Sequence, residues 1–97
     1  MEAGAMIFVR SGFERRYRKL SPQQQSKVDS ALLRFRDAVG KPQAHSGIGL
    51  RPFGRYLEFR AGLDLRILTI AEAGDWFLVC VGGHEEIRAC VRTKPKP

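Results

Sequence analysis

Apolar and polar positions in the first part of the chain predict a short strand followed by a helix. Met6–Arg10 (MIFVR) is a short apolar run consistent with a strand, and Ser11-Gly12 breaks it. Phe13, Tyr17 and Leu20 then fall at helical spacing, which indicates a short helix. Basic residues fill the opposite positions of this helix and give it one positive side: Arg15, Arg16, Arg18 and Lys19.

A second helix has clear signals at both of its ends. Ser21 can cap it, Pro22 suits the first helical position, and Gln24 stands where a capping box needs it. Gly40, ahead of a proline, is expected to end it. The apolar stripe between these ends consists of Val28, Leu32, Phe35 and Val39. We therefore expect a helical hairpin whose stripe lies on the strands that follow.

The second half of the chain has the pattern of several short strands. A loop rich in Pro, Gly and Ser, Lys41–Gly49, precedes them and contains His45, which we interpret as a loop residue. Short turns separate the last three expected strands, as is typical of antiparallel neighbours. His84–Arg92 could add a helical turn or an edge strand, and the tail TKPKP is expected to be loose. The four expected strands are Leu50–Phe53, Arg55–Ala61, Asp64–Ala71 and Trp76–Val81.

Together these elements predict a single α+β domain over residues 1–97, with an N-terminal helical hairpin packed on a mainly antiparallel, roughly four-stranded sheet. A chain of 97 residues can build one modest core. No stretch approaches the roughly 18 consecutive apolar residues of a membrane span, and the first residues lack the order of a secretion signal. We therefore expect a cytoplasmic protein that does not contact a membrane.

The formal net charge of +7 narrows the choice of partner. It favours a phosphate-rich molecule, because each neutralised phosphate releases condensed counterions. An anionic membrane or an acidic protein would also suit this charge, but no long basic amphipathic helix argues for lipid. Cys80 and Cys90 are too few for a disulfide scaffold and lack a metal-ligand spacing, so we expect buried, reduced thiols and no metal. No Gly-rich phosphate loop is present in the sequence, and no cofactor is expected.

Several charged residues stand within the otherwise apolar strand patterns. Because strand side chains alternate, Tyr56, Glu58 and Arg60 share one face of their strand, and Arg66 of the next strand can join them. A register slip by one residue would bury both arginines at high cost. The apolar residues expected under the helices are Leu57, Phe59, Leu65 and Ile67. The other face is therefore expected to be open, with His84 close to it after the Gly82-Gly83 pair.

These groups suit the cleavage of RNA by attack of a ribose 2′-hydroxyl on the adjacent phosphate. Glu58 can take the proton of the hydroxyl, and a protonated His84 can give one to the leaving 5′-oxygen. Arg60 and Arg66 can hold the phosphate oxygens and stabilise the crowded phosphorane. Such a mechanism needs no metal.

A purely structural explanation of the same residues stays open. Glu58 and Arg60 can pair across the sheet with neighbours such as Arg66, each pair contributing on the order of 0.2–1 kcal/mol. His84 and Glu85 can simply begin a helix, where an acidic residue is favourable. The basic side of the first helix can be a solvated face rather than a contact with nucleic acid or the ribosome.

Three segments, in this order, resemble the RelE/ParE superfamily of bacterial toxin–antitoxin toxins. FERRYRKLSPQQQSKVDSALLRF resembles the opening helical hairpin of the family, GRYLEFRAGLDLRILTI its strand pair, and VCVGGHEEIRACVR its closing segment. The resemblance runs from Ile7 to Arg92. It implies a RelE-like, microbial-RNase-like fold, a cognate antitoxin that wraps the toxin, and, in the RelE branch, cleavage of messenger RNA in the ribosomal A site.

Residues at matching positions inherit expected roles from this resemblance. Glu58 and Arg60 match the polar positions of the first strand, Arg66 matches the arginine of the second, and His84 matches the basic or acid residue near the end. Two departures concern aromatic residues. Leu65 stands where many active members have an aromatic, and Glu86-Ile87 stands where they have a tyrosine. Tyr56 is the expected substitute for stacking on a base.

The expected function is therefore that of a type II toxin, a ribosome-dependent and metal-independent mRNA endonuclease that inhibits translation. Its expected partners are the ribosome, mRNA and a cognate antitoxin, with which it can form a hetero-oligomer. The residues expected to bind RNA or the ribosome are Arg15, Arg16, Arg18, Lys19 and Tyr56. Two alternatives remain: a ParE-like poison of DNA gyrase, and a non-catalytic basic module that binds RNA or an acidic protein.

Overall fold

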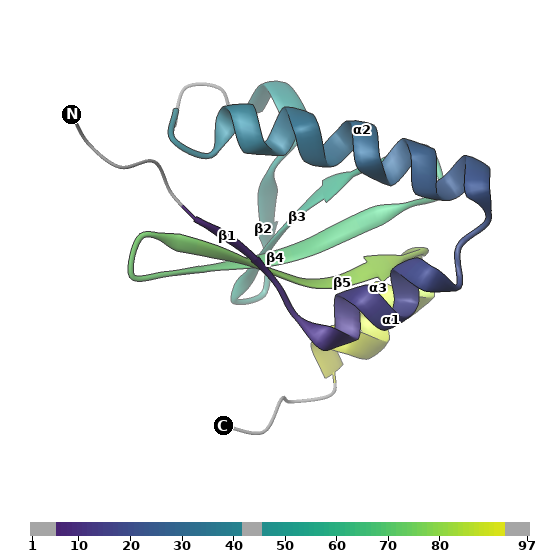
Figure 1. The fold of residues 1–97 in the computed structure, drawn as a ribbon. Coiled ribbons are helices and arrows are strands. Elements are labelled where there is room, and N and C mark those ends of the chain that lie inside the picture. The colour runs from purple at the N-terminus through teal and green to yellow at the C-terminus, as the bar shows by residue number, and fades with distance from the viewer. Residues whose placement is uncertain (1–5, 42–45, 93–97) are drawn as a thin grey trace.

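A computed structural model describes residues 6–41 and 46–92, and over these residues the chain has an α+β fold. His45 and the TKPKP tail lie outside the described residues. Figure 1 shows the arrangement of the elements. In chain order they are β1 (Ile7–Val9), α1 (Ser11–Arg18), α2 (Pro22–Ala38), the 3₁₀ turn η2 (Ser46–Ile48), β2 (Arg51–Phe53), β3 (Tyr56–Arg60), β4 (Arg66–Glu72), β5 (Asp75–Gly82) and α3 (His84–Arg92).

The strands form one mixed sheet in the order β1-β5-β4-β3-β2. The strands β2 to β5 form an antiparallel meander, as the short turns between them predict. The first strand lies parallel to β5, with Ile7 opposite Trp76. The expected sheet of about four strands is thus corrected to a five-stranded one, because the predicted first strand joins the edge of the meander.

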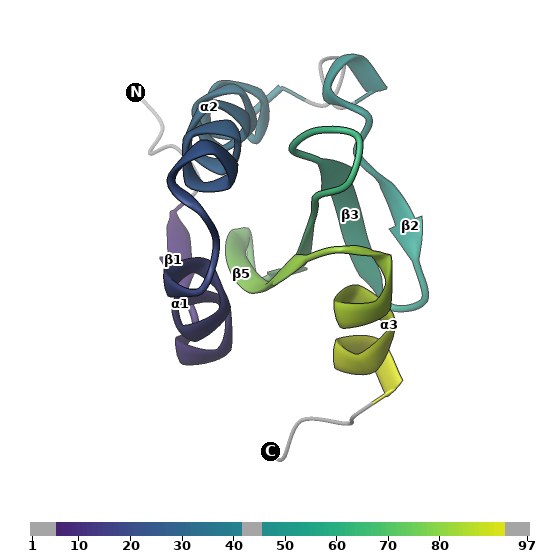
Figure 2. The same cartoon turned by 90° about the vertical axis from the view of Figure 1, so that its right-hand side faces the viewer.

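The N-terminal helical hairpin packs on one face of the sheet, as predicted (Figure 2). The ring of Phe35 from α2 stacks on Phe59 of β3 at 4.8 Å between centroids and meets the edge of Trp76 at 5.3 Å. Of the four residues expected beneath the helices, Phe59, Leu65 and Ile67 are buried in this core, and Leu57 is half-buried and packs against it.

Local interactions explain why the hairpin forms where it does. The side chain of Ser21 accepts a hydrogen bond from the backbone N–H of Gln24, whose side chain accepts one from the N–H of Ser21, so the predicted capping box is present. The Tyr17 hydroxyl donates a 2.6 Å hydrogen bond to Asp29 and so joins α1 to α2. This bond is the main reason why the pKa of Tyr17 is raised above its ordinary value.

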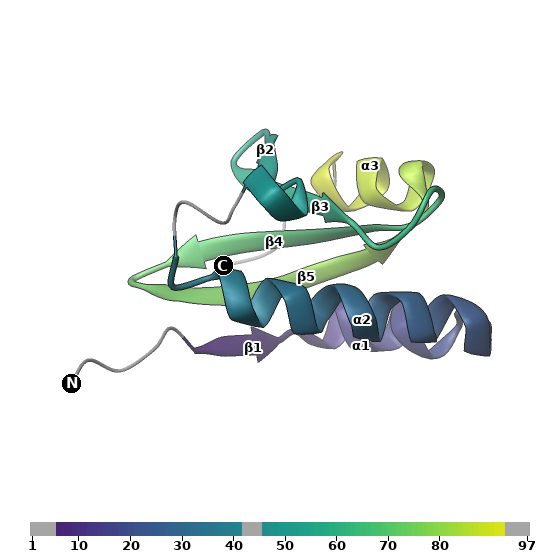
Figure 3. The same cartoon turned by 90° about the horizontal axis from the view of Figure 1, so that it is seen from above.

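The C-terminal helix α3 covers part of the opposite face of the sheet, as the view from above shows (Figure 3). Ile87 of α3 is buried in a second core that also includes Tyr56, Leu68 and Cys80. Within the described residues, no helix is long and apolar enough to cross a membrane.

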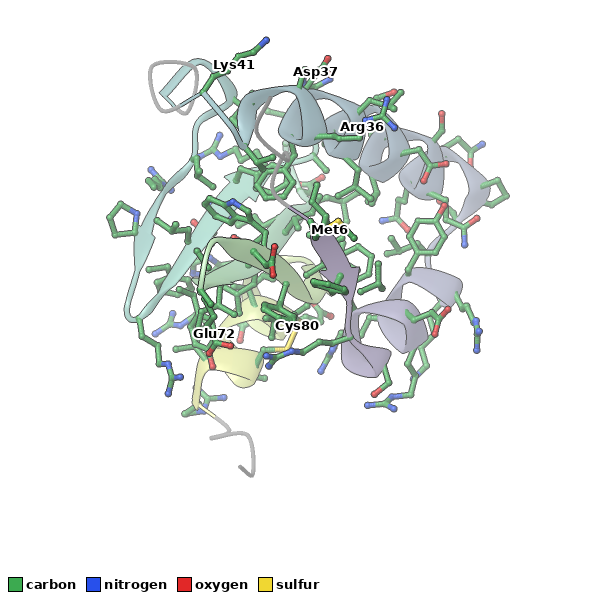
Figure 4. All side chains as sticks on the ribbon, turned by 60° about the vertical axis from the view of Figure 1, so that its left-hand side comes forward. Met6, Arg36, Asp37, Lys41, Glu72 and Cys80 are labelled. Atoms are coloured by element: carbon green, nitrogen blue, oxygen red, sulfur yellow. A yellow bond between two sulfur atoms is a disulfide. The ribbon has the colours of Figure 1, made fainter. Side chains whose placement is uncertain are left out.

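Cys80 of β5 and Cys90 of α3 form a disulfide (Figure 4). The expectation of two reduced thiols is therefore wrong for this structure. The reason is topological: α3 folds back over the strand that precedes it, and this brings a strand residue and a helix residue ten positions apart into contact. The bond fastens α3 to the sheet.

Candidate functional site

Strand register brings three arginines around one glutamate. Arg60 lies opposite Arg66 in the β3–β4 pair, and Arg51 lies opposite Glu58 in the β2–β3 pair. Directly opposed residues in antiparallel strands project from the same face, so all four side chains share one side of the sheet. We call Arg51, Arg60 and Arg66 with Glu58 the arginine cluster. The predicted placement of Arg60 and Arg66 on a common face is confirmed.

Glu58 is the buried centre of the arginine cluster. Its Oε1 accepts from Arg66 Nη1 at 3.1 Å and lies 3.5 Å from Arg51 Nη2. The Glu58 side chain is only 6% exposed, whereas those of Arg66 and Arg51 are 19% and 57% exposed. The second oxygen, Oε2, is buried and has no hydrogen-bond partner among the residues that the structure describes. One oxygen thus orients two guanidinium groups, and the other keeps a free acceptor capacity.

A hollow of about 350 Å³ adjoins the arginine cluster. Arg51, Glu58 and Arg60 line it together with Gly49 and Leu50. Arg60 is exposed and forms no ion pair within the described residues. Three arginines share this face of the sheet with one carboxylate, which leaves a surplus of positive charge that suits an anion such as a phosphate.

His84 begins α3, at the end of β5, as its place after Gly82-Gly83 predicts. It is exposed and shares a hollow of about 490 Å³ with Arg66. Arg66 therefore links the ion pair of Glu58 with the surroundings of His84. The same hollow carries carboxylates, which oppose the approach of a phosphate to its rim: Asp64, Glu85 and Glu86.

Tyr56 does not lie on an open surface. Its relative exposure is 4%, and it packs in the core beneath α3. The expectation of an open second face is wrong at this position, because α3 folds over the part of the sheet that includes Tyr56. A buried ring cannot stack on a nucleobase, so the predicted stacking role of Tyr56 is corrected.

The basic residues of α1 are Arg15, Arg16 and Arg18, and Lys19 is its C-cap residue. Arg15, Arg18 and Lys19 are exposed, and Arg16 is half-buried. Arg18 forms an ion pair with Glu14 at 3.6 Å, one helical turn earlier. Both the solvated face and the nucleic-acid contact remain compatible with this arrangement.

Arg51 is a site residue that the sequence interpretation missed, although a signal for it exists. The two residues Gly54 and Arg55 connect β2 to β3, and Gly54 takes a positive φ of 65°. A two-residue turn pairs Phe53 with Tyr56 and so fixes the register of the hairpin. Counting back along both strands places Arg51 opposite Glu58.

The comparisons with known proteins concern the fold. No family model matches the chain, and no curated protein matches it. Among solved structures, the conserved hypothetical protein HP0894 from Helicobacter pylori is 12% identical, with a TM-score of 0.60 over 86% of this chain and 98% of that one. HP0892 from the same organism is 16% identical, with a TM-score of 0.48 over the same shares. The likeness to HP0894 shows a common α+β fold. Any argument about function must therefore come from the chemistry of the site.

Proposed function

We propose that this protein is a RelE/ParE-like toxin of a type II toxin–antitoxin system that cleaves messenger RNA on the ribosome without a metal. The observation that carries the proposal is the arrangement of Glu58, with one oxygen held by Arg66 and Arg51 and the other without a partner in the described part of the chain. A surplus of guanidinium groups around a free carboxylate oxygen suits the transfer of a proton beside a phosphate.

In the proposed reaction, the RNA phosphate lies between Arg60 and Arg66, and Arg51 adds positive charge. Glu58 Oε2 takes the proton of the ribose 2′-hydroxyl, and the 2′-oxygen then attacks the phosphorus. The bond from phosphorus to the 5′-oxygen breaks, and His84 gives its proton to that oxygen. The products are a 2′,3′-cyclic phosphate and a free 5′-hydroxyl. The arginines supply the larger part of the rate, because they stabilise the charge of the phosphorane.

The burial of Glu58 sets a condition on this mechanism. RNA must reach Oε2 through the hollow lined by Arg51, Glu58 and Arg60. Displacement of Arg51 from its 3.5 Å contact would open that route, and its side chain is already more than half exposed. We therefore expect Arg51 to move toward the phosphate when RNA binds.

The decisive experiment is induced expression followed by mapping of transcript ends, with and without translation. We expect growth arrest and new 5′ ends within translated transcripts. Arg66→Ala should relieve the arrest without unfolding the domain, and Arg36→Ala, on the exposed side of α2, is the matched control that should leave it intact. Arrest that persists with a folded Arg66→Ala protein would contradict the proposed site. DNA breaks with normal translation would indicate a gyrase poison instead.

The proposed partner is an antitoxin whose acidic or amphipathic segment covers the arginine cluster. The net charge of +7 supports such a partner, because charge complementarity speeds association and orients it. Co-expression of the product of the neighbouring reading frame should suppress the arrest and yield a cytoplasmic hetero-oligomer. If the two proteins do not co-purify, this assignment of the partner fails.

A second candidate, a non-catalytic basic module that binds RNA or an acidic protein, is favoured by the burial of Glu58 and by the carboxylates around His84. The two candidates differ in what they require of the acid–base groups. For a binding module, Glu58→Gln and His84→Ala should leave every phenotype unchanged while substitutions of the arginines weaken binding. For the nuclease, each of the two substitutions alone should reduce the rate of cleavage by about 10²-fold or more.

A further inference from the structure

A separate hollow of about 320 Å³ lies between α1 and α3. Arg15 and Arg16 line it from α1, Ala89 and Cys90 from α3, and Tyr56 from β3. No member of the arginine cluster lines it. The two helices stand on either side of β5 in Figure 2, and the disulfide to Cys80 fastens the α3 wall to that strand.

Tyr56 contributes an unpaired polar group to this hollow. The residue is only 4% exposed, yet it lines the hollow, and its hydroxyl makes no hydrogen bond within the described residues. The hydroxyl oxygen is not sealed from solvent, and the residue lines the hollow, so a ligand bound there can reach it. A buried tyrosine hydroxyl normally finds a hydrogen-bond partner. Because this hydroxyl has no partner among the described residues, it is available to donate to a ligand in the hollow.

The charges around the hollow indicate an anionic ligand. Two arginines line it, and no Asp or Glu does so among the described residues. Arg15 and Arg16 form no ion pair in the part of the chain that the structure describes, whereas Arg18 is held by Glu14. This hollow therefore differs from that of His84, in which carboxylates oppose an anion.

We propose that the hollow binds one phosphate group of an RNA strand, with Arg15 and Arg16 on its oxygens and the Tyr56 hydroxyl donating a hydrogen bond to it. The apolar wall of Val79 and Ala89 would then contact the ribose. The assignment of this phosphate group to RNA rests on the proposed function, cleavage of messenger RNA. Tyr56 thus recognises the backbone through its hydroxyl, in a role different from stacking on a base.

The test measures binding of a 2′-O-methylated single-stranded oligonucleotide, which cannot be cleaved, by fluorescence anisotropy. Tyr56→Phe removes only the hydroxyl and should weaken binding by about 3–10-fold, while its unfolding midpoint shows that the ring still packs. Arg16→Gln should weaken binding further and reduce the slope of log K against log salt concentration by roughly 0.7. Arg36→Gln, the same change on the exposed side of α2, should alter binding by less than about 2-fold because Arg36 does not line this hollow.

Binding that is unchanged in a folded Tyr56→Phe protein would overturn the proposal, as would equal losses for Arg16→Gln and Arg36→Gln. Inorganic phosphate distinguishes the source of the ligand. If it binds as tightly as the oligonucleotide and depends equally on Tyr56, the assignment to RNA is wrong.

Arg66→Ala separates this proposal from the nuclease itself. In the Arg66→Ala background, cleavage should be abolished, but adding Tyr56→Phe should still weaken oligonucleotide binding by the same factor. If the wild-type protein cleaves no transcript and the effect of Tyr56→Phe on binding persists, the proposed nuclease fails and the phosphate site stands. If the wild-type protein cleaves transcripts but Tyr56→Phe does not weaken binding, the phosphate site fails and the proposed nuclease stands.

Discussion

At the residue scale, Glu58 shows how the same side chain can serve both the fold and the proposed chemistry. Its Oε1 pairs with two arginines, which offsets the cost of burying a carboxylate, and its Oε2 has no partner over residues 6–41 and 46–92. The ion pairs of Oε1 fit the explanation that Glu58 stabilises the sheet, and the unpaired Oε2 fits the explanation that Glu58 acts as a base. The role of Oε1 can be tested by measuring the stability of the domain, and the role of Oε2 by measuring RNA cleavage.

Glu58→Gln should destabilise the domain by about 1–3 kcal/mol, because it removes the negative charge that pairs with Arg66 in a mostly buried position. Urea denaturation monitored by circular dichroism measures this change. Glu72→Gln is the control: Glu72 is 52% exposed and 4.0 Å from Arg10, so its loss should cost less than about 0.5 kcal/mol. Equal effects of the two substitutions would mean that the Glu58 pairs contribute little to stability.

At the element scale, the position of α3 decides which side chains are open to solvent. The predicted alternation of strand residues is correct, and so is the face assigned to Arg60 and Arg66. Burial of Tyr56 and the pairing of Cys80 with Cys90 follow from the docking of α3, a tertiary contact that a local pattern does not encode. The sequence leaves the last segment open between a helical turn and an edge strand, and it therefore cannot supply this contact.

Loss of the disulfide should loosen α3 more than the rest of the fold. A cross-link between residues ten positions apart is worth about 2–3 kcal/mol in the chain-entropy account. Cys90→Ser, or a reductant, should therefore speed hydrogen exchange of the α3 amides relative to those of α2. The reductant should have no further effect on Cys90→Ser. Equal acceleration in both helices would show that the bond stabilises the domain as one unit.

The link between α1 and α2 should depend on pH in a defined direction. The hydrogen bond to Asp29 raises the pKa of Tyr17 in the folded state, so its contribution is fully present below the unfolded pKa of about 10 and is lost as pH rises through the folded value. Tyr17→Phe should cost about 0.5–1.5 kcal/mol near neutral pH. The difference in unfolding free energy between the two proteins should shrink above about pH 10. A difference that stays constant to higher pH would exclude this role.

At the scale of the whole molecule, local signals predict the elements and long-range contacts complete the fold. The capping box at Ser21 starts α2 where expected, because its partners lie three residues apart. The pairing of Ile7 with Trp76 spans most of the chain, and no short pattern specifies which strand β1 will join. The same distinction holds for the candidate site. Strand alternation predicts that its arginines share one face, whereas the hollows beside them are formed by residues of η2, β2 and α3, which come together only through long-range contacts.

The two proposed phosphate sites lead to a prediction about whether their contributions to binding add. The arginine cluster and the hollow between α1 and α3 share no lining side chain, so their contributions to binding should be independent. For an uncleavable oligonucleotide long enough to reach both, the losses in log K from Arg16→Gln and Arg60→Ala should add in the double variant. For an oligonucleotide that reaches only one site, the second substitution should have little effect, because the gain from a linked second contact is absent. A double variant no weaker than either single one, with the long strand, would mean that both arginines hold the same phosphate.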